Sequence, residues 1–220
     1  MAQADTALRD LITYPKAFLE NNGLMIYSGD RGSGVISFRL VLLEDQWQSV
    51  IGGAARSIPA WGLAFDGVKL GKARTGEAQS APISAQYVSM REYKNGGYEA
   101  ADVTHYTLPG AGGPDVMFTS KLNGCSFGIG SSGGGARLVT HLRPPSGTGP
   151  VNERLAALSG GVDAGFAANG GALDAKVTSD SLQNATILGR RSGTDWKFFV
   201  QRFKVAGSFA KPMVEMVLTL

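Results

Sequence analysis

The sequence predicts a single α+β domain over residues 1–220, with a mixed β-sandwich core flanked by short helices and long loops. Two observations predict this class. One segment near the N-terminus has helical spacing of its apolar residues, whereas from Leu24 onward short apolar runs are bounded by Gly, Pro, Asn or Asp. The 31 glycines have no repeating period, so they indicate many turns. No stretch of changed composition marks a linker between domains.

An N-terminal helix is expected within Thr6–Glu20, because its apolar residues recur at roughly helical spacing. These residues are Ala7, Leu8, Leu11, Ile12 and Phe18. Pro15 lacks a backbone N–H, so it breaks or kinks this helix. A second short helix is expected over Asn152–Leu158, with Asn152 as its N-cap and Gly160 beyond its end.

Strands are expected where apolar, β-branched and aromatic residues lie between clusters of turn-forming residues. In the first half of the chain these runs are Leu24–Tyr27, Val35–Leu43, Trp47–Ile51, Leu63–Phe65, Pro82–Tyr93, Asp102–Leu108 and Asp115–Thr119. In the second half they are Phe127–Gly130, Ala136–Leu142, Lys176–Ser179, Ala185–Gly189, Asp195–Val205 and Pro212–Leu220. Many short strands with two helices are typical of a sandwich that carries helices and loops.

The single cysteine, Cys125, and His141 flank a predicted hairpin with a glycine-rich loop. If Gly130 faces Ala136 across this loop, Cys125 faces His141. Directly opposed residues have Cβ atoms roughly 4.5–5.5 Å apart, close enough for a thiol and an imidazole to share a proton. A slip of one residue would put the two side chains on opposite faces of the sheet.

A cysteine beside a histidine can act as a nucleophile. A neighbouring imidazolium lowers the pKa of the thiol, and the same imidazole can protonate a leaving amine. This chemistry suits peptide bonds and side-chain amides, which would pass through a thioester. The backbone N–H groups of Gly124 and Cys125 are candidates for stabilising the oxyanion, and Thr119 and Ser120 can supply a hydroxyl.

The segment Leu122-Asn123-Gly124-Cys125 resembles the Leu-Ser-Gly-Cys motif of bacterial glutamine deamidase toxins. This family includes the catalytic domain of cytotoxic necrotizing factor and Burkholderia lethal factor. The resemblance implies that Cys125 is the nucleophile, His141 the general acid and base, and Thr119 an active-site threonine. Asn123 stands where the family has serine. The family's fold, a β-sandwich flanked by helices, agrees with the strand pattern described above.

The resemblance further implies a toxin or effector that converts one glutamine of a host protein to glutamate, with no cofactor and no metal. Family members act on Rho-type GTPases or on a translation-initiation helicase, so a host protein of such a kind is the expected partner. The expected protein is a monomer, secreted or injected by bacteria, that acts in the host cytoplasm. No Sec signal peptide and no apolar run of membrane-spanning length occur in the sequence. The net charge of +3, with scattered basic residues, does not favour nucleic acid as a partner.

Other functions remain open at this stage. A cysteine protease or a transglutaminase shares the first half of the chemistry, and a non-catalytic β-sandwich binding module would bury Cys125 as a small apolar residue. His105, the other histidine, can replace His141 as the base if its strand lies beside Cys125. The G-x-G-x-x-G match at Gly128–Gly133 precedes a strand-like run rather than a helix, which argues against a dinucleotide site. One cysteine and two histidines give little material for a zinc site.

Overall fold

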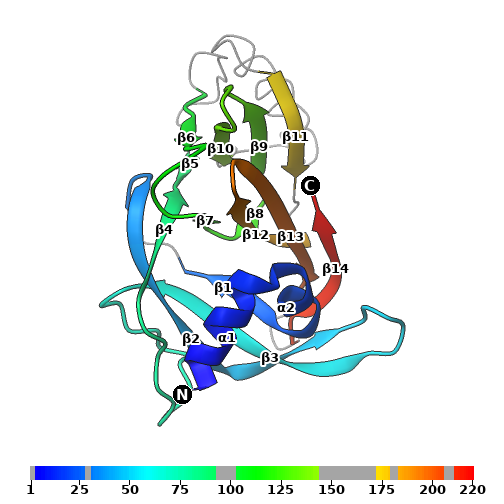
Figure 1. The fold of residues 1–220 in the computed structure, drawn as a ribbon. Helices are drawn as coiled ribbons and strands as arrows, with labels where there is room; N and C mark the ends of the chain where they lie inside the picture. The colour runs from blue at the N-terminus through cyan, green and yellow to red at the C-terminus, as the bar shows by residue number, and fades with distance from the viewer. Residues whose placement is uncertain (1–2, 28–30, 93–102, 144–171, 179–182, 206–210) are drawn as a thin grey trace.

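The computed structural model describes residues 3–27, 31–92, 103–143, 172–178, 183–205 and 211–220 (Figure 1). In this part of the chain two helices, α1 (Gln3–Thr13) and α2 (Pro15–Asn21), precede the strands. The first strands are β1 (Gly23–Ile26), β2 (Gly34–Ser49), β3 (Arg56–Phe65), β4 (Ile83–Val88), β5 (Met90–Glu92), β6 (Tyr106–Leu108) and β7 (Val116–Thr119). The remaining strands are β8 (Leu122–Asn123), β9 (Ser126–Ser131), β10 (Arg137–Arg143), β11 (Ala172–Thr178), β12 (Gln183–Ser192), β13 (Asp195–Lys204) and β14 (Met213–Thr219). The predicted α+β class, with strands predominating, is confirmed.

The N-terminal segment forms two helices rather than one kinked helix. Pro15 takes the first position of α2, where its missing N–H costs no helical hydrogen bond. The buried faces of α1 and α2, which include Leu8, Leu11, Phe18 and Leu19, join one core cluster with residues of β1, β2 and β3. The helices therefore cover part of the first sheet.

The first sheet has nine described strands in the order β1-β3-β2-β14-β13-β12-β7-β4, and β8 pairs with β12. The start of β2 also pairs with β4, at Gly34–Phe38, and β4 pairs with β7. These pairings connect β2, β14, β13, β12, β7 and β4 into a closed circuit. A strand of 16 residues, β2, makes this possible because its two ends pair with different neighbours.

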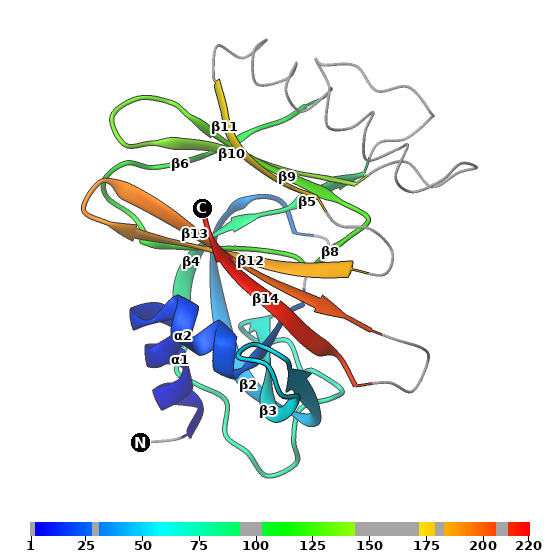
Figure 2. The same ribbon diagram turned by 90° about the vertical axis from the view of Figure 1, so that its right-hand side faces the viewer.

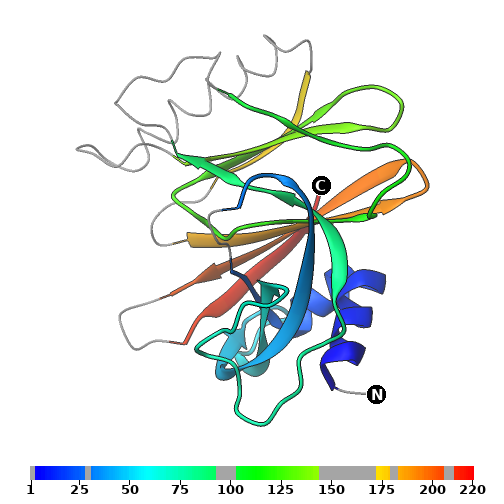
Figure 3. The same ribbon diagram turned by 90° about the vertical axis from the view of Figure 1, so that its left-hand side faces the viewer.

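The second sheet has the order β11-β9-β10-β5, with β6 also paired to β10. Figures 2 and 3 show it as a layer beside β12 and β13 of the first sheet. One core cluster joins the layers, with Phe127 and Val139 from the second sheet and Ile187, Phe198 and Val200 from the first. The chain passes between the sheets after Val88, from β4 to β5, and again at Gly124, from β8 to β9.

Several strand predictions differ from the structure. The runs Val35–Leu43 and Trp47–Ile51 are one strand, β2, whose register with β3 shifts between Leu42 and Gln46. Strand β3 begins at Arg56, well before the predicted Leu63, and contains Pro59 beside this register shift. The run Pro82–Tyr93 is divided at Ser89 into two strands that enter different sheets.

The predicted register between Cys125 and His141 is wrong by two positions. His141 pairs with Phe127, Leu138 pairs with Gly130, and Cys125 lies just before β9. Because side chains alternate along a strand, a shift of two positions preserves the face that each residue occupies. The prediction that Cys125 and His141 belong on one face is therefore compatible with the observed register, although they are not directly opposed.

The predicted helix Asn152–Leu158 lies outside the described residues. In the described part of the chain, no helix is long and apolar enough to cross a membrane.

Candidate functional site

Three of the predicted site residues lie at the junction of the two sheets. Thr119 ends β7, Cys125 follows the crossing at Gly124, and His141 lies in β10 of the second sheet. Their side chains are buried, with exposed fractions of 0% for Thr119, 1% for Cys125 and 1% for His141. Thr119 also pairs in register with Val88, the last residue of β4.

The hydrogen bonds around Thr119 fix the proton on the His141 ring. The Thr119 hydroxyl donates to the Val88 carbonyl oxygen at 2.7 Å, and its Oγ1 lies 2.7 Å from His141 Nδ1. A hydroxyl has one hydrogen to donate, so Nδ1 carries a proton and donates it to Oγ1. The Ser120 hydroxyl lies 3.4 Å from the same nitrogen. This arrangement leaves Nε2 as the basic nitrogen of His141.

His141 is electrically neutral in this conformation. Complete burial lowers its pKa from 6.5 to about 3. Its Nε2 has no hydrogen-bond partner among the described residues. The ring packs edge to face against Phe127, with ring centroids 6.3 Å apart. The sequence suggested an imidazolium that lowers the pKa of the thiol, whereas the structure has a neutral imidazole.

The thiol of Cys125 is held by contacts on two sides. Its Sγ lies 3.6 Å from the Asn123 carbonyl oxygen and 3.8 Å from Met90 Sδ. Met90 is in turn the register partner of His141, on the neighbouring strand β5. Cys125 and His141 therefore share Met90 as a neighbour. The burial of the thiol is a property that a structural cysteine would also have.

Gly124, predicted to bring the backbone close to a bound oxyanion, has a φ angle of +69°. This left-handed conformation favours glycine, because a Cβ would crowd the backbone. Leu122 is fully buried, and Asn123, which is exposed, pairs with Asn184 of β12. The motif thus forms the crossing from the first sheet to the second.

Lys121 is a neighbour of Cys125 that the sequence did not single out. Partial burial lowers the pKa of its ammonium group, and attraction to the Cys125 thiolate opposes this shift. By the same interaction, the ammonium group favours the ionised thiol. A basic residue four positions before a cysteine is too common a pattern to have indicated this pair.

A pocket of about 330 Å³ opens beside His141. Its described lining comes from four segments: Gly32 and Ser33 before β2, Val88 and Ser89 at the end of β4, and two further segments that lie side by side. These segments contribute Thr104, His105 and Tyr106, and Val139, Thr140 and His141. Both histidines of the chain therefore line one pocket, which the sequence did not predict.

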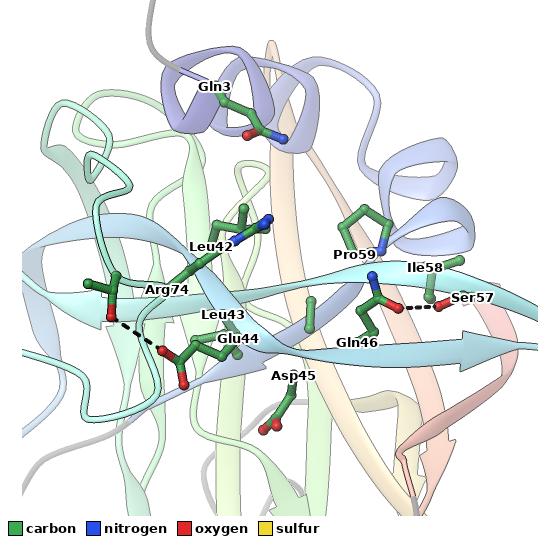
Figure 4. A pocket seen from close by; sticks show the side chains of 12 residues that line it. Gln3, Leu42, Leu43, Glu44, Asp45, Gln46, Ser57, Ile58, Pro59 and Arg74 are labelled. Atoms are coloured by element: carbon green, nitrogen blue, oxygen red, sulfur yellow. Dashed lines mark hydrogen bonds between the residues drawn. The ribbon is translucent and has the colours of Figure 1, made fainter.

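A second pocket, of about 540 Å³, lies where the register of β2 and β3 shifts (Figure 4). Several of its polar groups are already hydrogen bonded: Ser57 donates to Gln46 and Thr75 to Glu44 within the lining, and Asp45 accepts from Lys72 outside it. No cysteine or histidine lines it among the described residues. Of the predicted pair, His141 belongs to the described lining of the smaller pocket.

The described residues contain no group of three or more His, Cys, Asp or Glu side chains that could hold a metal ion. Comparison with protein-family models gave no match, and comparison with curated proteins gave no significant match. The functional interpretation therefore depends on the geometry around Cys125, Thr119 and His141.

Proposed function

We propose that this protein is a cysteine-dependent deamidase that converts a glutamine of another protein to glutamate, with Cys125 as nucleophile and His141 as general acid and base. The observation that carries the proposal is the chain from the Val88 carbonyl through Thr119 to His141 Nδ1. Because this chain of hydrogen bonds keeps the proton on Nδ1, the lone pair that can accept a proton is on Nε2. The third residue of a catalytic triad fixes the catalytic histidine in the same way.

The reaction would begin with the neutral pair. As Cys125 Sγ bonds to the carboxamide carbon, its proton passes to His141 Nε2, and the carbonyl oxygen gains negative charge. The C–N bond then breaks, and His141 gives the proton to the leaving nitrogen, which departs as ammonia. His141 next takes a proton from water, whose oxygen attacks the thioester. The products are glutamate and the restored thiol.

The resemblance of Leu122–Cys125 to the motif of glutamine deamidase toxins supports this choice of reaction. On that basis the proposed setting is the cytoplasm of a host cell, with a host protein as substrate. The neutral ring of His141 implies that proton transfer accompanies sulfur attack, because a base of such low pKa does not hold a separate imidazolium at neutral pH.

The burial of Cys125 supports a second candidate, a non-catalytic binding module in which the thiol is a core residue. The two candidates differ in the chemistry that they allow. A binding module would leave every protein of a cell lysate unmodified, whereas a deamidase would convert at least one glutamine to glutamate.

The test is to incubate the protein, and its Cys125→Ser variant, with lysates of several host types and to map glutamine-to-glutamate conversions by mass spectrometry. We expect at least one site that requires Cys125. A cut chain or a new cross-link at that site would indicate a protease or transglutaminase instead. Absence of any cysteine-dependent site in all lysates would favour the binding module.

Thr119 provides the matched pair of variants for this assay. Thr119→Ser keeps the hydroxyl, so it should retain most of the activity. Thr119→Val keeps the volume but removes the acceptor for Nδ1, so deamidation should fall on the order of 100-fold. Equal activity of the two variants would contradict the role of the hydrogen-bond chain.

A further inference from the structure

A row of paired residues crosses the first sheet from the segment of Cys125 towards solvent. Leu122 of β8 pairs with Ala185 of β12, and Ala185 pairs with Arg202 of β13. Arg202 in turn pairs with Met216 of β14, the next strand of the sheet (Figure 2). Directly paired residues share one face of a sheet, and Leu122 and Ala185 belong to the core cluster that contains Cys125. Arg202 therefore continues the face that packs beside the thiol.

The guanidinium group of Arg202 forms no ion pair with a described residue. It is half-buried, and its Nε is fully buried without a hydrogen-bond partner among the described residues. Glu215, which precedes Met216, is already paired with Lys204 at 2.7 Å. A buried donor that lacks an acceptor is costly, and more so when its group is charged. This position therefore favours a ligand that brings a negatively charged acceptor.

Arg202 differs in this respect from other half-buried arginines of the described chain. Those arginines have carboxylate partners: Arg39 pairs with Asp66, Arg137 with Asp174 and Arg190 with Asp115. Lys121, which immediately precedes the row at Leu122, is a second half-buried cation without an ion pair to a described carboxylate. Two cations that lack acidic partners thus lie on the two sides of Ala185.

The surface along this row is accessible. Met216 is 47% exposed, Asn123 is exposed, and Gly124 is half-buried. Neighbouring strands are about 4.8 Å apart, so two strand spacings separate the backbones of Leu122 and Arg202 by roughly 10 Å. An extended segment advances about 3.3 Å per residue, so a glutamine beside Cys125 and a carboxylate at Arg202 would be about three residues apart.

We propose that the surface formed by Lys121, Arg202 and Met216 binds an acidic segment of the substrate protein, with a carboxylate of that segment accepting hydrogen bonds from Arg202. The inference rests on the proposed deamidase function and names the chemistry of its substrate: a glutamine with Asp or Glu about three residues away. The planar guanidinium group suits this role, because it can donate two parallel hydrogen bonds to one carboxylate. Arg202 is thus a specificity-determining residue that does not touch the reacting amide.

The probes are two short synthetic peptides with a central glutamine. One peptide carries a glutamate about three positions to each side of it, and the other carries the neutral γ-methyl ester of glutamate at the same positions. The readout is proton–nitrogen NMR of the Cys125→Ser variant, in which no turnover occurs, at the backbone signals of Ala185 and Met216. We expect the acidic peptide to bind about tenfold or more tightly than the ester, because hydrogen bonds between charged groups are stronger than neutral ones. Equal affinity of the two peptides, or binding of neither, would overturn the proposal.

Arg202→Gln, made in the same background, tests the individual residue. It should abolish the preference for the acidic peptide. Lys197→Gln is the matched control, because it removes the same charge from an exposed position of β13. Lys197 lies an odd number of positions from Arg202, on the opposite face of the sheet, so its loss should change the affinity by no more than about twofold. A preference that survives in Arg202→Gln, or that falls equally in both variants, would contradict the assignment. If Arg202→Gln does not fold, the comparison of the two peptides still decides the proposal.

The titration separates this proposal from the proposed function, because it measures binding alone. Preference for the acidic peptide without any deamidation in lysates would support the surface and contradict the enzyme. Deamidation in lysates without a preference for the acidic peptide would overturn the surface and leave the enzyme in place.

Discussion

The ring of His141 combines two properties that rarely occur together on a surface histidine: a fixed proton position and complete burial. Thr119 determines which nitrogen carries the proton, and the surrounding apolar residues determine that the ring stays neutral. Both effects arise from residues distant in sequence, on β7 and β9.

Burial of a neutral histidine makes stability depend on pH in a defined direction. The pKa of His141 is about 3 when folded and near 6.5 when unfolded, so the unfolded chain binds the extra proton between these values. The contribution of neutral His141 to the free energy of unfolding is fully present above about pH 6.5, and it is lost as the pH falls towards 3. From pH 7 to pH 5 the loss is about 2 kcal/mol.

The measurement is urea denaturation of the wild type and of His141→Gln at pH 7 and pH 5. Because glutamine does not titrate, the wild type should lose about 2 kcal/mol more than the variant over this interval. His105 and the carboxylates are common to both proteins, so their contributions cancel. An identical pH dependence in the two proteins would show that His141 is not buried in its neutral form.

At the scale of elements, the crossing from β8 to β9 is what brings Cys125 between the two sheets. Gly124 makes this crossing with a φ angle of +69°, and Gly67 has a comparable angle of +85° in a turn with open space around it. Alanine at either position should cost roughly 1–2 kcal/mol, because an L-residue is strained in this conformation.

The two glycines differ in what their strain would disturb. Gly124→Ala should also change the rate at which iodoacetamide alkylates Cys125 in the folded protein, whereas Gly67→Ala should leave this rate unchanged. The stability of both variants is read from chemical denaturation, and the rate from intact mass. Equal rates in the two variants would mean that Gly124 does not control the position of the thiol.

An element can be predicted from the sequence when the pattern that indicates it lies within that segment of the chain. The apolar and β-branched run at β10 and the aromatic run at β13 predicted strands correctly, and the helical spacing within Thr6–Glu20 correctly predicted helical structure, with a break at Pro15. The first part of β3 was not predicted, because Pro59 is unusual in a strand; it is tolerated beside the register shift opposite Gln46. The register of β9 and β10 was also wrong, because a loop of consecutive glycines does not specify how many residues the turn uses.

The residues of the candidate site were likewise predictable only where residue type or a motif indicated them. Cys125, Thr119 and His141 stood out by residue type and by the motif, and the structure brings Thr119 and His141 into contact. The roles of Val88, Met90 and Lys121 were not predictable, because they depend on where β4 and β5 lie relative to β7, β9 and β10. Long-range strand pairing supplies that information, and no local pattern encodes it.

For the whole molecule, Gln201 of β13 connects the N-terminal segment to the first sheet. Its buried side chain donates to the Leu19 and Asn22 carbonyl oxygens, both at 2.6 Å, and accepts from the Leu24 N–H. Gln201→Leu would leave these backbone groups without their partner. We expect a loss of roughly 3 kcal/mol or more in the free energy of unfolding.

The exposed Gln46, which bonds Ser57 at the surface, is the matched control for this substitution. Gln46→Leu should change stability by no more than about 0.5 kcal/mol. Thermal and urea denaturation of both variants measure the difference. A comparably small effect at Gln201 would mean that water replaces the lost bonds.

The position of β14 has a consequence for the time at which the protein can fold. This strand lies between β13 and β2, so the closed circuit of pairings lacks a member until residue 219 has been synthesised. Helix α2 packs against β13 and β14, so its packing also depends on strands that follow it by more than 170 residues. Such pairings between distant segments are slow to form. The circuit around the first sheet therefore closes only after the segment that contains β14 has been synthesised.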